Sequence, residues 1–102
     1  MTFKTIEERE AYAEKACKLT DLGWAFYLIG KAITENPTRH YDAYSRDFRR
    51  IAHEDILKLL DMGILTHEEG TVCRLILTEK GKNLLPRYIK AANIFMAIMN
   101  DF

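Results

Sequence analysis

Histidine, serine and cysteine are the residues from which catalytic or metal chemistry would be built, and their spacing in this chain completes no such site. Residues 53–54 and 67–68 both read His-Glu, the start of the His-Glu-x-x-His motif, which needs a second histidine four residues on so that both imidazoles face one metal. Those positions hold Leu57 and Thr71. We therefore expect no metal site, because the ligand spacing is absent.

The nucleophiles and loops of common enzyme classes are also missing their partners. Ser45 is the single serine and lies in Tyr-Ser-Arg, outside any Gly-x-Ser-x-Gly turn. The five glycines are isolated, so no phosphate-binding loop of the Walker or Rossmann type exists. Cys17 and Cys73 are expected to be reduced, mostly buried thiols, with a disulfide between them as the alternative. We expect neither an enzyme nor a cofactor.

Basic side chains in one short stretch indicate a different chemistry, the binding of nucleic-acid phosphates. The candidate nucleic-acid-binding residues are Arg46, Arg49, Arg50, His53 and Lys58. The chain as a whole adds no attractive field, because 15 Lys and Arg balance 15 Asp and Glu. The alternative interpretation is a solvated helix start with local ion pairs, since charge runs are usually surface.

A helix predicted over Phe48–Asp61 would position these side chains, because apolar residues recur in it at steps of three and four. Gly63 can end that helix, since glycine takes the left-handed cap conformation without strain. Ile64 and Leu65 then begin a strand, residues 68–71 form a turn, and residues 72–77 return. Strand alternation would place Cys73, Leu75 and Leu77 on one face of the hairpin.

Two helices are predicted before this unit, with a short helix or turn at residues 38–44. Thr5 and Glu8 form a capping box for the first helix, which ends near Lys18. Thr20 and Asp21 cap the second, which is apolar on most sides and therefore buried. It ends at residues 36–37, Asn-Pro, because the residue before proline disfavours helix.

Thr78 and Glu79 cap the last helix, in which Pro86 should cause a kink or a break. Beyond residue 94 this helix has almost no polar face, so its own domain or a symmetry mate must cover it. The residues predicted to contact a second subunit or partner are Ile94, Phe95, Ile98, Met99 and Phe102.

Residues 19–23 read Leu-Thr-Asp-Leu-Gly and residues 77–81 read Leu-Thr-Glu-Lys-Gly, and each segment leads into a long apolar helix. Chance explains so short a match about as well as duplication does. A duplication would make the protein two related motifs with a groove between them.

The order helix, Gly63-Ile64-Leu65, hairpin, Leu-Thr-x-x-Gly, helix resembles the second half of a winged helix-turn-helix domain, as in small dimeric archaeal and bacterial regulators. The resemblance covers about residues 48 to 88. It implies that Phe48–Asp61 is a recognition helix in the major groove, with Arg46, Arg50 and His53 as its best contacts and the remaining basic residues on phosphates. A dimer would place two such helices roughly 34 Å apart.

Acidic residues depart from that pattern, because they repel phosphate on the recognition face and at the wing tip. They are Glu54, Asp61, Glu68 and Glu69. They favour the alternative function, a non-enzymatic protein–protein interaction module. In it a peptide or helix would lie in a groove between two related helical motifs, lined by residues such as Trp24, Phe26, Phe95 and Met99.

The sequence thus predicts one domain, mainly α with a small β-hairpin, winged-helix-like, with a long apolar C-terminal helix. Residues 1–37 form the N-terminal helices, 38–78 the helix-turn-helix and wing, and 79–102 the C-terminal helix. We expect a homodimeric transcription regulator that binds double-stranded DNA. The apolar runs are too short to span a bilayer and no signal peptide is apparent, so we expect a cytoplasmic protein without a membrane partner.

Overall fold

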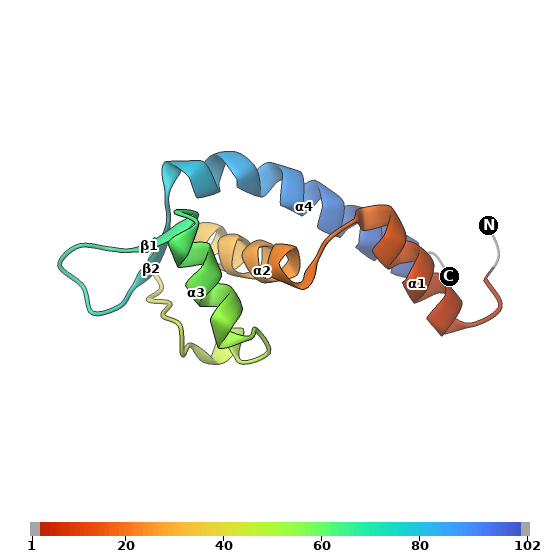
Figure 1. The fold of residues 1–102 in the computed structure, drawn as a ribbon, viewed down its shortest axis with the longest axis horizontal. Coiled ribbons are helices and arrows are strands. Elements are labelled where there is room, and N and C mark those ends of the chain that lie inside the picture. The colour runs from red at the N-terminus through yellow and green to blue at the C-terminus, as the bar shows by residue number, and fades with distance from the viewer. Residues whose placement is uncertain (1–2, 101–102) are drawn as a thin grey trace.

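In the computed structural model, which describes residues 3–100, four α-helices and a short antiparallel hairpin follow one another along the chain (Figure 1). The elements are α1 (Ile6–Cys17), α2 (Asp21–Glu35), the 3₁₀ helix η1 (Arg46–Phe48), α3 (His53–Asp61), β1 (Leu65–His67), β2 (Leu75–Leu77) and α4 (Glu79–Asn100). The prediction of a mainly α fold with a small hairpin is confirmed. Across the described residues, no helix is long and apolar enough to cross a membrane.

Threonine side chains begin three of the helices. The Oγ1 atom of Thr5 accepts a hydrogen bond from the backbone of Glu8 at 3.0 Å, that of Thr20 from Gly23 at 3.1 Å, and that of Thr78 from Gly81 at 3.0 Å. Each bond satisfies an amide that the first helical turn leaves without a partner. The three predicted caps are confirmed.

The core surrounds α2, which packs against α3, β2 and α4. Its side chains Phe26 and Ile29 are almost fully buried, as the all-round apolar pattern of this helix predicts. They meet apolar side chains of the other elements. These include Ile56, Leu59, Leu65, Leu75 and Leu85.

The Leu-Thr-x-x-Gly segment at residues 77–81 joins the start of α4 to the end of α3. The backbone amide of Thr78 donates to the carbonyl oxygen of Ile64 at 3.1 Å, and its hydroxyl contacts the carbonyl oxygens of Gly63 and Ile64. A Cβ atom at Gly81 would collide with the Ile64 carbonyl oxygen. The segment at residues 19–23 shares the threonine cap, but Gly23 faces the side chains of Leu19 and Tyr88 instead.

Helix α1 lies apart from this core, along the far half of α4 (Figure 1). Ala13 and Cys17 of α1 and Ala92 of α4 are buried there. The paired helices α1 and α4 give the molecule its extended shape, 53 × 25 × 24 Å. The start of α1 and the end of α4 lie on the same side of the molecule (Figure 1).

One of two predicted alternatives and one local prediction need correction. Of the kink or break predicted at Pro86, the break does not occur, since α4 is continuous from Glu79 to Asn100. The proline lies on the exposed side, where water can hydrate the Lys82 carbonyl left without its donor. Strand β2 begins only at Leu75, so Cys73 does not share the buried face of Leu75 and Leu77. Cys73 is exposed with φ of 56° in the hairpin loop, and both cysteines are free.

Candidate nucleic-acid interface

The arginines predicted to bind nucleic acid lie on the 3₁₀ helix η1 and the turn after it rather than on an α-helix. The prediction of a helix over Phe48–Asp61 is wrong for residues 48–52, because α3 begins only at His53. The amides of Phe48, Arg49 and Ile51 donate to carbonyl oxygens three residues back, which is the tighter 3₁₀ pattern. Ala52, with φ of −61° and ψ of 131°, then interrupts the helical backbone. We call residues 44–52 the arginine loop.

A buried aromatic side chain fixes the arginine loop to the core. The ring of Phe48, 3% exposed, stacks on Tyr41 with centroids 5.2 Å apart and planes 24° from parallel. The carboxylate of Asp47 forms an ion pair with the guanidinium of Arg39, with Oδ2 and Nη1 3.3 Å apart. With Phe48 turned inward, Arg46, Arg49 and Arg50 stay on the surface, around a depression of about 320 Å³.

The three guanidinium groups have no acidic partner within the described part of the chain, residues 3–100. No carboxylate there lies within salt-bridge distance of Arg46, Arg49 or Arg50. Lys58, by contrast, pairs with Glu54 at 3.4 Å. Within residues 46–50 an ion pair therefore forms at Asp47, which Arg39 binds, and not at the three arginines, which are exposed and free to meet an external anion.

An exposed aromatic pair closes the arginine loop. The rings of Tyr44 and His53 stack with centroids 5.2 Å apart and planes 19° from parallel. Tyr44 is 85% exposed and precedes the arginines, while His53 opens α3. Sequence analysis missed Tyr44, although its position directly before the basic stretch was a usable signal.

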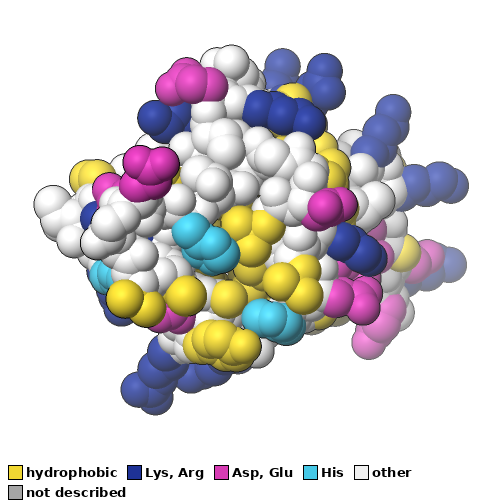
Figure 2. Space-filling view, turned by 60° about the vertical axis from the view of Figure 1, so that its left-hand side comes forward, with side chains coloured by type: hydrophobic (Ala, Val, Ile, Leu, Met, Phe, Trp, Pro, Cys, Tyr) yellow, Lys and Arg dark blue, Asp and Glu magenta, His cyan; other side chains and the backbone are white. Residues whose placement is uncertain are grey.

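The outer face of α3 mixes apolar and charged side chains. Leu57 and Met62 are about half exposed, at 51% and 45%, and Glu54 and Asp61 lie on the surface beside them. Figure 2 shows one face of the molecule on which histidine and hydrophobic side chains occupy the middle, while Lys and Arg project around the edge. Positive charge is therefore peripheral on that face.

The hairpin carries less free negative charge than its sequence indicates. The carboxylate of Glu68 pairs with Arg74 at 3.1 Å, and the Nη2 atom of Arg74 donates to the carbonyl oxygen of Pro37 at 2.8 Å. Arg74 thus ties the hairpin to the segment after α2. A single charge in the apolar stretch 72–77 was the signal for this role. Of the two acidic residues in the hairpin, Glu69 is the one that is exposed and forms no ion pair within residues 3–100.

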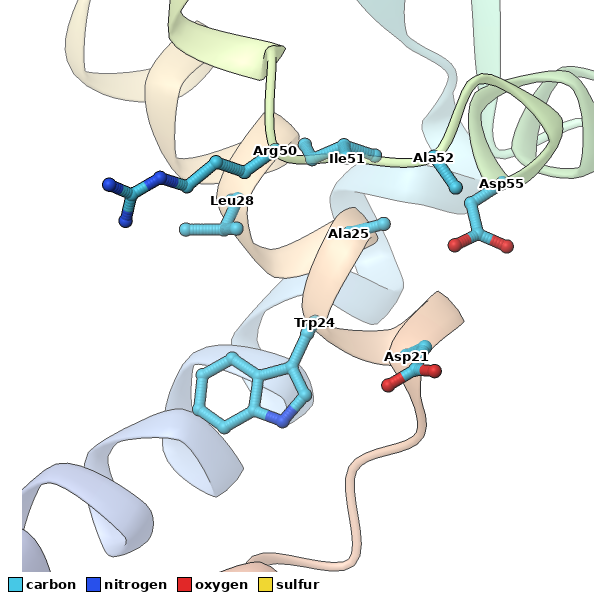
Figure 3. A pocket seen from close by; sticks show the side chains of 8 residues that line it. All are labelled: Asp21, Trp24, Ala25, Leu28, Arg50, Ile51, Ala52 and Asp55. Carbon is cyan, nitrogen blue, oxygen red and sulfur yellow. The ribbon is translucent and has the colours of Figure 1, made fainter.

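A cleft of about 340 Å³ lies between α2 and the segment that leads into α3 (Figure 3). Asp21 and Trp24 line it from α2, Arg50 from the arginine loop and Asp55 from α3. The guanidinium of Arg50 points away from both carboxylates (Figure 3). Arg50 therefore lies at the mouth of the cleft and stays available to solvent.

The predicted partner-contact residues of α4 differ in exposure. Phe95 packs edge-on against Trp24 of its own chain, with centroids 5.1 Å apart and planes at 79°. Ile94 and Met96 are 40% and 38% exposed. Ile98 and Met99 are half-buried, and Phe102 lies outside the described residues.

Lys31, a side chain with a raised pKa, lies on α2 and not in the arginine loop. The hydroxyl of Tyr27 accepts a hydrogen bond from Lys31 at 3.3 Å, and this bond, together with the charges of Tyr27 and Glu35, raises the pKa of Lys31 above its ordinary value of 10.5. Nowhere in residues 3–100 do three or more His, Cys, Asp or Glu side chains gather as metal ligands would.

Comparison with other proteins adds nothing to this geometry: no family model, no curated protein and no solved structure matches the chain.

Proposed function

We propose that this protein is a small DNA-binding regulator of transcription with a winged-helix arrangement, acting as a dimer. The observation that carries the proposal is the arginine loop. Three arginines without acidic partners in residues 3–100 lie on a segment anchored by Phe48, immediately before α3. Phosphates are the anions that such clusters bind best, because guanidinium donors match their oxygens in pairs.

In this proposal the N-terminal end of α3 approaches the major groove and the arginine loop lies over the flanking backbone. Arg46, Arg49 and Arg50 neutralise phosphates, and His53, the first residue of α3, faces the base edges. Lys58 contributes less to phosphate binding, because its ammonium group already forms an ion pair with Glu54.

The dimer is proposed from the exposed apolar side chains of α4. Ile94 is 40% exposed and lines one depression on α4 together with Ile89 and Ala97. A second α4 would bury this depression and would set the separation of the two arginine loops. Met96 lies on a different face of the helix, because residues two apart do not share a face. Light scattering should give twice the monomer mass of 11.9 kDa, and Ile94→Glu should return a monomer. A monomeric wild-type protein would refute the dimer.

A salt titration tests the DNA proposal. The protein is titrated with a labelled random-sequence duplex at several salt concentrations, and the slope of log affinity against log salt is compared with that of Arg46→Gln/Arg49→Gln/Arg50→Gln. The slope changes by about 0.9 per phosphate contact, so three lost contacts should reduce its magnitude by about 2.7 per subunit.

The matched control removes three lysines from the far end of the molecule, Lys4→Gln/Lys15→Gln/Lys18→Gln. It makes the same change in net charge and should leave the slope nearly unaltered. Absence of duplex binding by the wild-type protein at low salt, or equal slopes for both triple variants, would reject the arginine loop as the DNA contact.

The second candidate function is binding of a protein partner, favoured by the half-exposed side chains of Leu57 on α3 and of Met62 directly after it. Phe26 cannot line the groove expected from the sequence, because it is 1% exposed and packs against Tyr88. A partner would instead meet the outer face of α3. Under this function, Leu57→Asp would abolish partner binding, whereas the arginine triple variant would retain it.

A further inference from the structure

We infer that the free face of Tyr44 is a stacking site for an unpaired nucleobase, so that the arginine loop also binds single-stranded DNA. The inference rests on the proposed function for its phosphate contacts, which the same arginines would supply. It goes beyond that function in the ligand, because a base inside a duplex presents no open ring face.

Tyr44 has an exposed ring on a backbone that hydrogen bonds hold in place. Its ring is 85% exposed, whereas Tyr27 and Tyr41 are each 2% exposed and Tyr12 packs against Phe3. Single exposed aromatic residues are common on protein surfaces. This one is distinguished by a backbone that holds it in place.

Hydrogen bonds within residues 42–45 build a tight turn that presents the ring. The amide of Tyr44 donates to the carboxylate of Asp42 at 2.8 Å, and the amide of Asp42 donates to the hydroxyl of Ser45 at 2.8 Å. The amide of Ser45 donates to the carbonyl oxygen of Asp42 at 3.1 Å. Such side-chain-to-backbone bonds stiffen turns, so a ligand loses little of its binding free energy in ordering the site.

The stack with His53 leaves most of the Tyr44 ring open. The two rings are only 19° from parallel with centroids 5.2 Å apart, and Tyr44 remains 85% exposed, so a face of its ring is accessible. A flat base can extend this stack by one layer. Stacking on an aromatic side chain does not depend on which base is present, since every base has a π-face.

Positive charge lies close to Tyr44 along the chain. Proteins that bind single strands combine aromatic platforms with basic groups that follow the backbone. Arg46 lies two residues after Tyr44, and Arg49 and Arg50 follow on the same anchored loop, with no acidic partner in residues 3–100. A base on Tyr44 would bring its neighbouring phosphates to these side chains.

The test compares two oligomers with equal numbers of phosphates, a labelled oligo-dT and an oligomer of abasic sites. The wild-type protein should bind oligo-dT more tightly than the abasic strand. Tyr44→Ala should weaken oligo-dT binding by about 5- to 140-fold, the range for one stacked base, and leave abasic binding unchanged. Tyr44→Phe should retain the wild-type affinity, and Tyr44→Leu, which is apolar but not flat, should behave as Tyr44→Ala.

A random duplex is titrated in parallel, and circular dichroism confirms that each variant is folded. Equal binding of oligo-dT and the abasic strand by the wild-type protein overturns the inference, and so does the absence of oligo-dT binding. Duplex binding alongside either result leaves the proposed function standing. Base-dependent binding of oligo-dT without duplex binding would reject the duplex proposal and support the stacking site.

Discussion

Thr78→Ala should destabilise the protein more than the same change at the equivalent position of the earlier Leu-Thr-x-x-Gly segment, Thr20→Ala. Both threonines cap a helix by accepting from a glycine amide. Thr78 additionally contacts the carbonyl oxygens of Gly63 and Ile64, which joins α4 to the end of α3. Thr20 has no such second contact within the described residues.

The magnitudes follow from these contacts. Loss of a threonine cap lowers the free energy of unfolding by about 0.5–2 kcal/mol. A further hydrogen bond between elements contributes about 0.5–1.5 kcal/mol. We therefore expect a loss of about 1–3 kcal/mol for Thr78→Ala, against about 1 kcal/mol for Thr20→Ala. Thr78→Ser keeps the hydroxyl and should retain most of the stability.

Urea unfolding followed by the fluorescence of Trp24, the only tryptophan, measures these differences directly. Protein concentration must be the same for every variant, because dimerisation would add to the apparent stability. The midpoint should shift while the slope stays constant, which marks a change in stability rather than in the unfolded state. A loss for Thr78→Ala no greater than that for Thr20→Ala would refute the assigned role of the second contact.

Three further outcomes are expected. Gly81→Ala should lower the free energy of unfolding by about 1–2 kcal/mol, because the clash of its Cβ with the Ile64 carbonyl outweighs the better helix propensity of alanine; an unchanged or stabilised variant in urea would contradict this. Ellman's reagent should modify Cys73 rapidly in the folded protein and Cys17 only after unfolding, and simultaneous reaction of both thiols would be inconsistent with the fold. The pKa of Lys31 is raised in the folded protein, so the contribution of its charge to stability is complete below pH about 10 and is lost as the pH rises through that pKa. NMR titration should show that Lys31 loses its proton at lower pH in Tyr27→Phe than in the wild-type protein. Identical titrations would exclude the hydrogen bond to Tyr27 as the cause.

The features that sequence predicted well are those set by neighbouring residues. Thr5, Thr20 and Thr78 cap the helices that follow them because the bond spans only three residues. The burial of α2 follows from its own apolar pattern. One detail differs, because Glu8 accepts from the amide of Lys4 at 2.8 Å rather than from that of Thr5.

The features that sequence missed depend on contacts between distant residues. The apolar spacing from Phe48 onward fits a continuous helix as well as a 3₁₀ turn, and the stack of Phe48 on Tyr41 favours the turn. The hairpin is shorter than predicted because Cys73 has φ of 56°, which interrupts the extended backbone before Leu75. The amide of Leu75 faces away from β1 and donates to the Tyr41 carbonyl oxygen at 2.7 Å, a contact with a segment far away in sequence. The stack of Tyr44 on His53 likewise depends on the shape of the arginine loop.

The placement of α1 has a consequence for how the molecule opens. This helix meets the rest of the chain mainly along the far half of α4, and its buried residues Ala13 and Cys17 lie outside the principal apolar cluster. Because this contact joins the two extremes of the sequence, we expect α1 to dock late in folding, after the local contacts of α2, α3 and the hairpin. Detachment of α1 would open only part of the molecule and leave the arginine loop intact. The amide protons of α1 should therefore exchange with solvent well before those of α2.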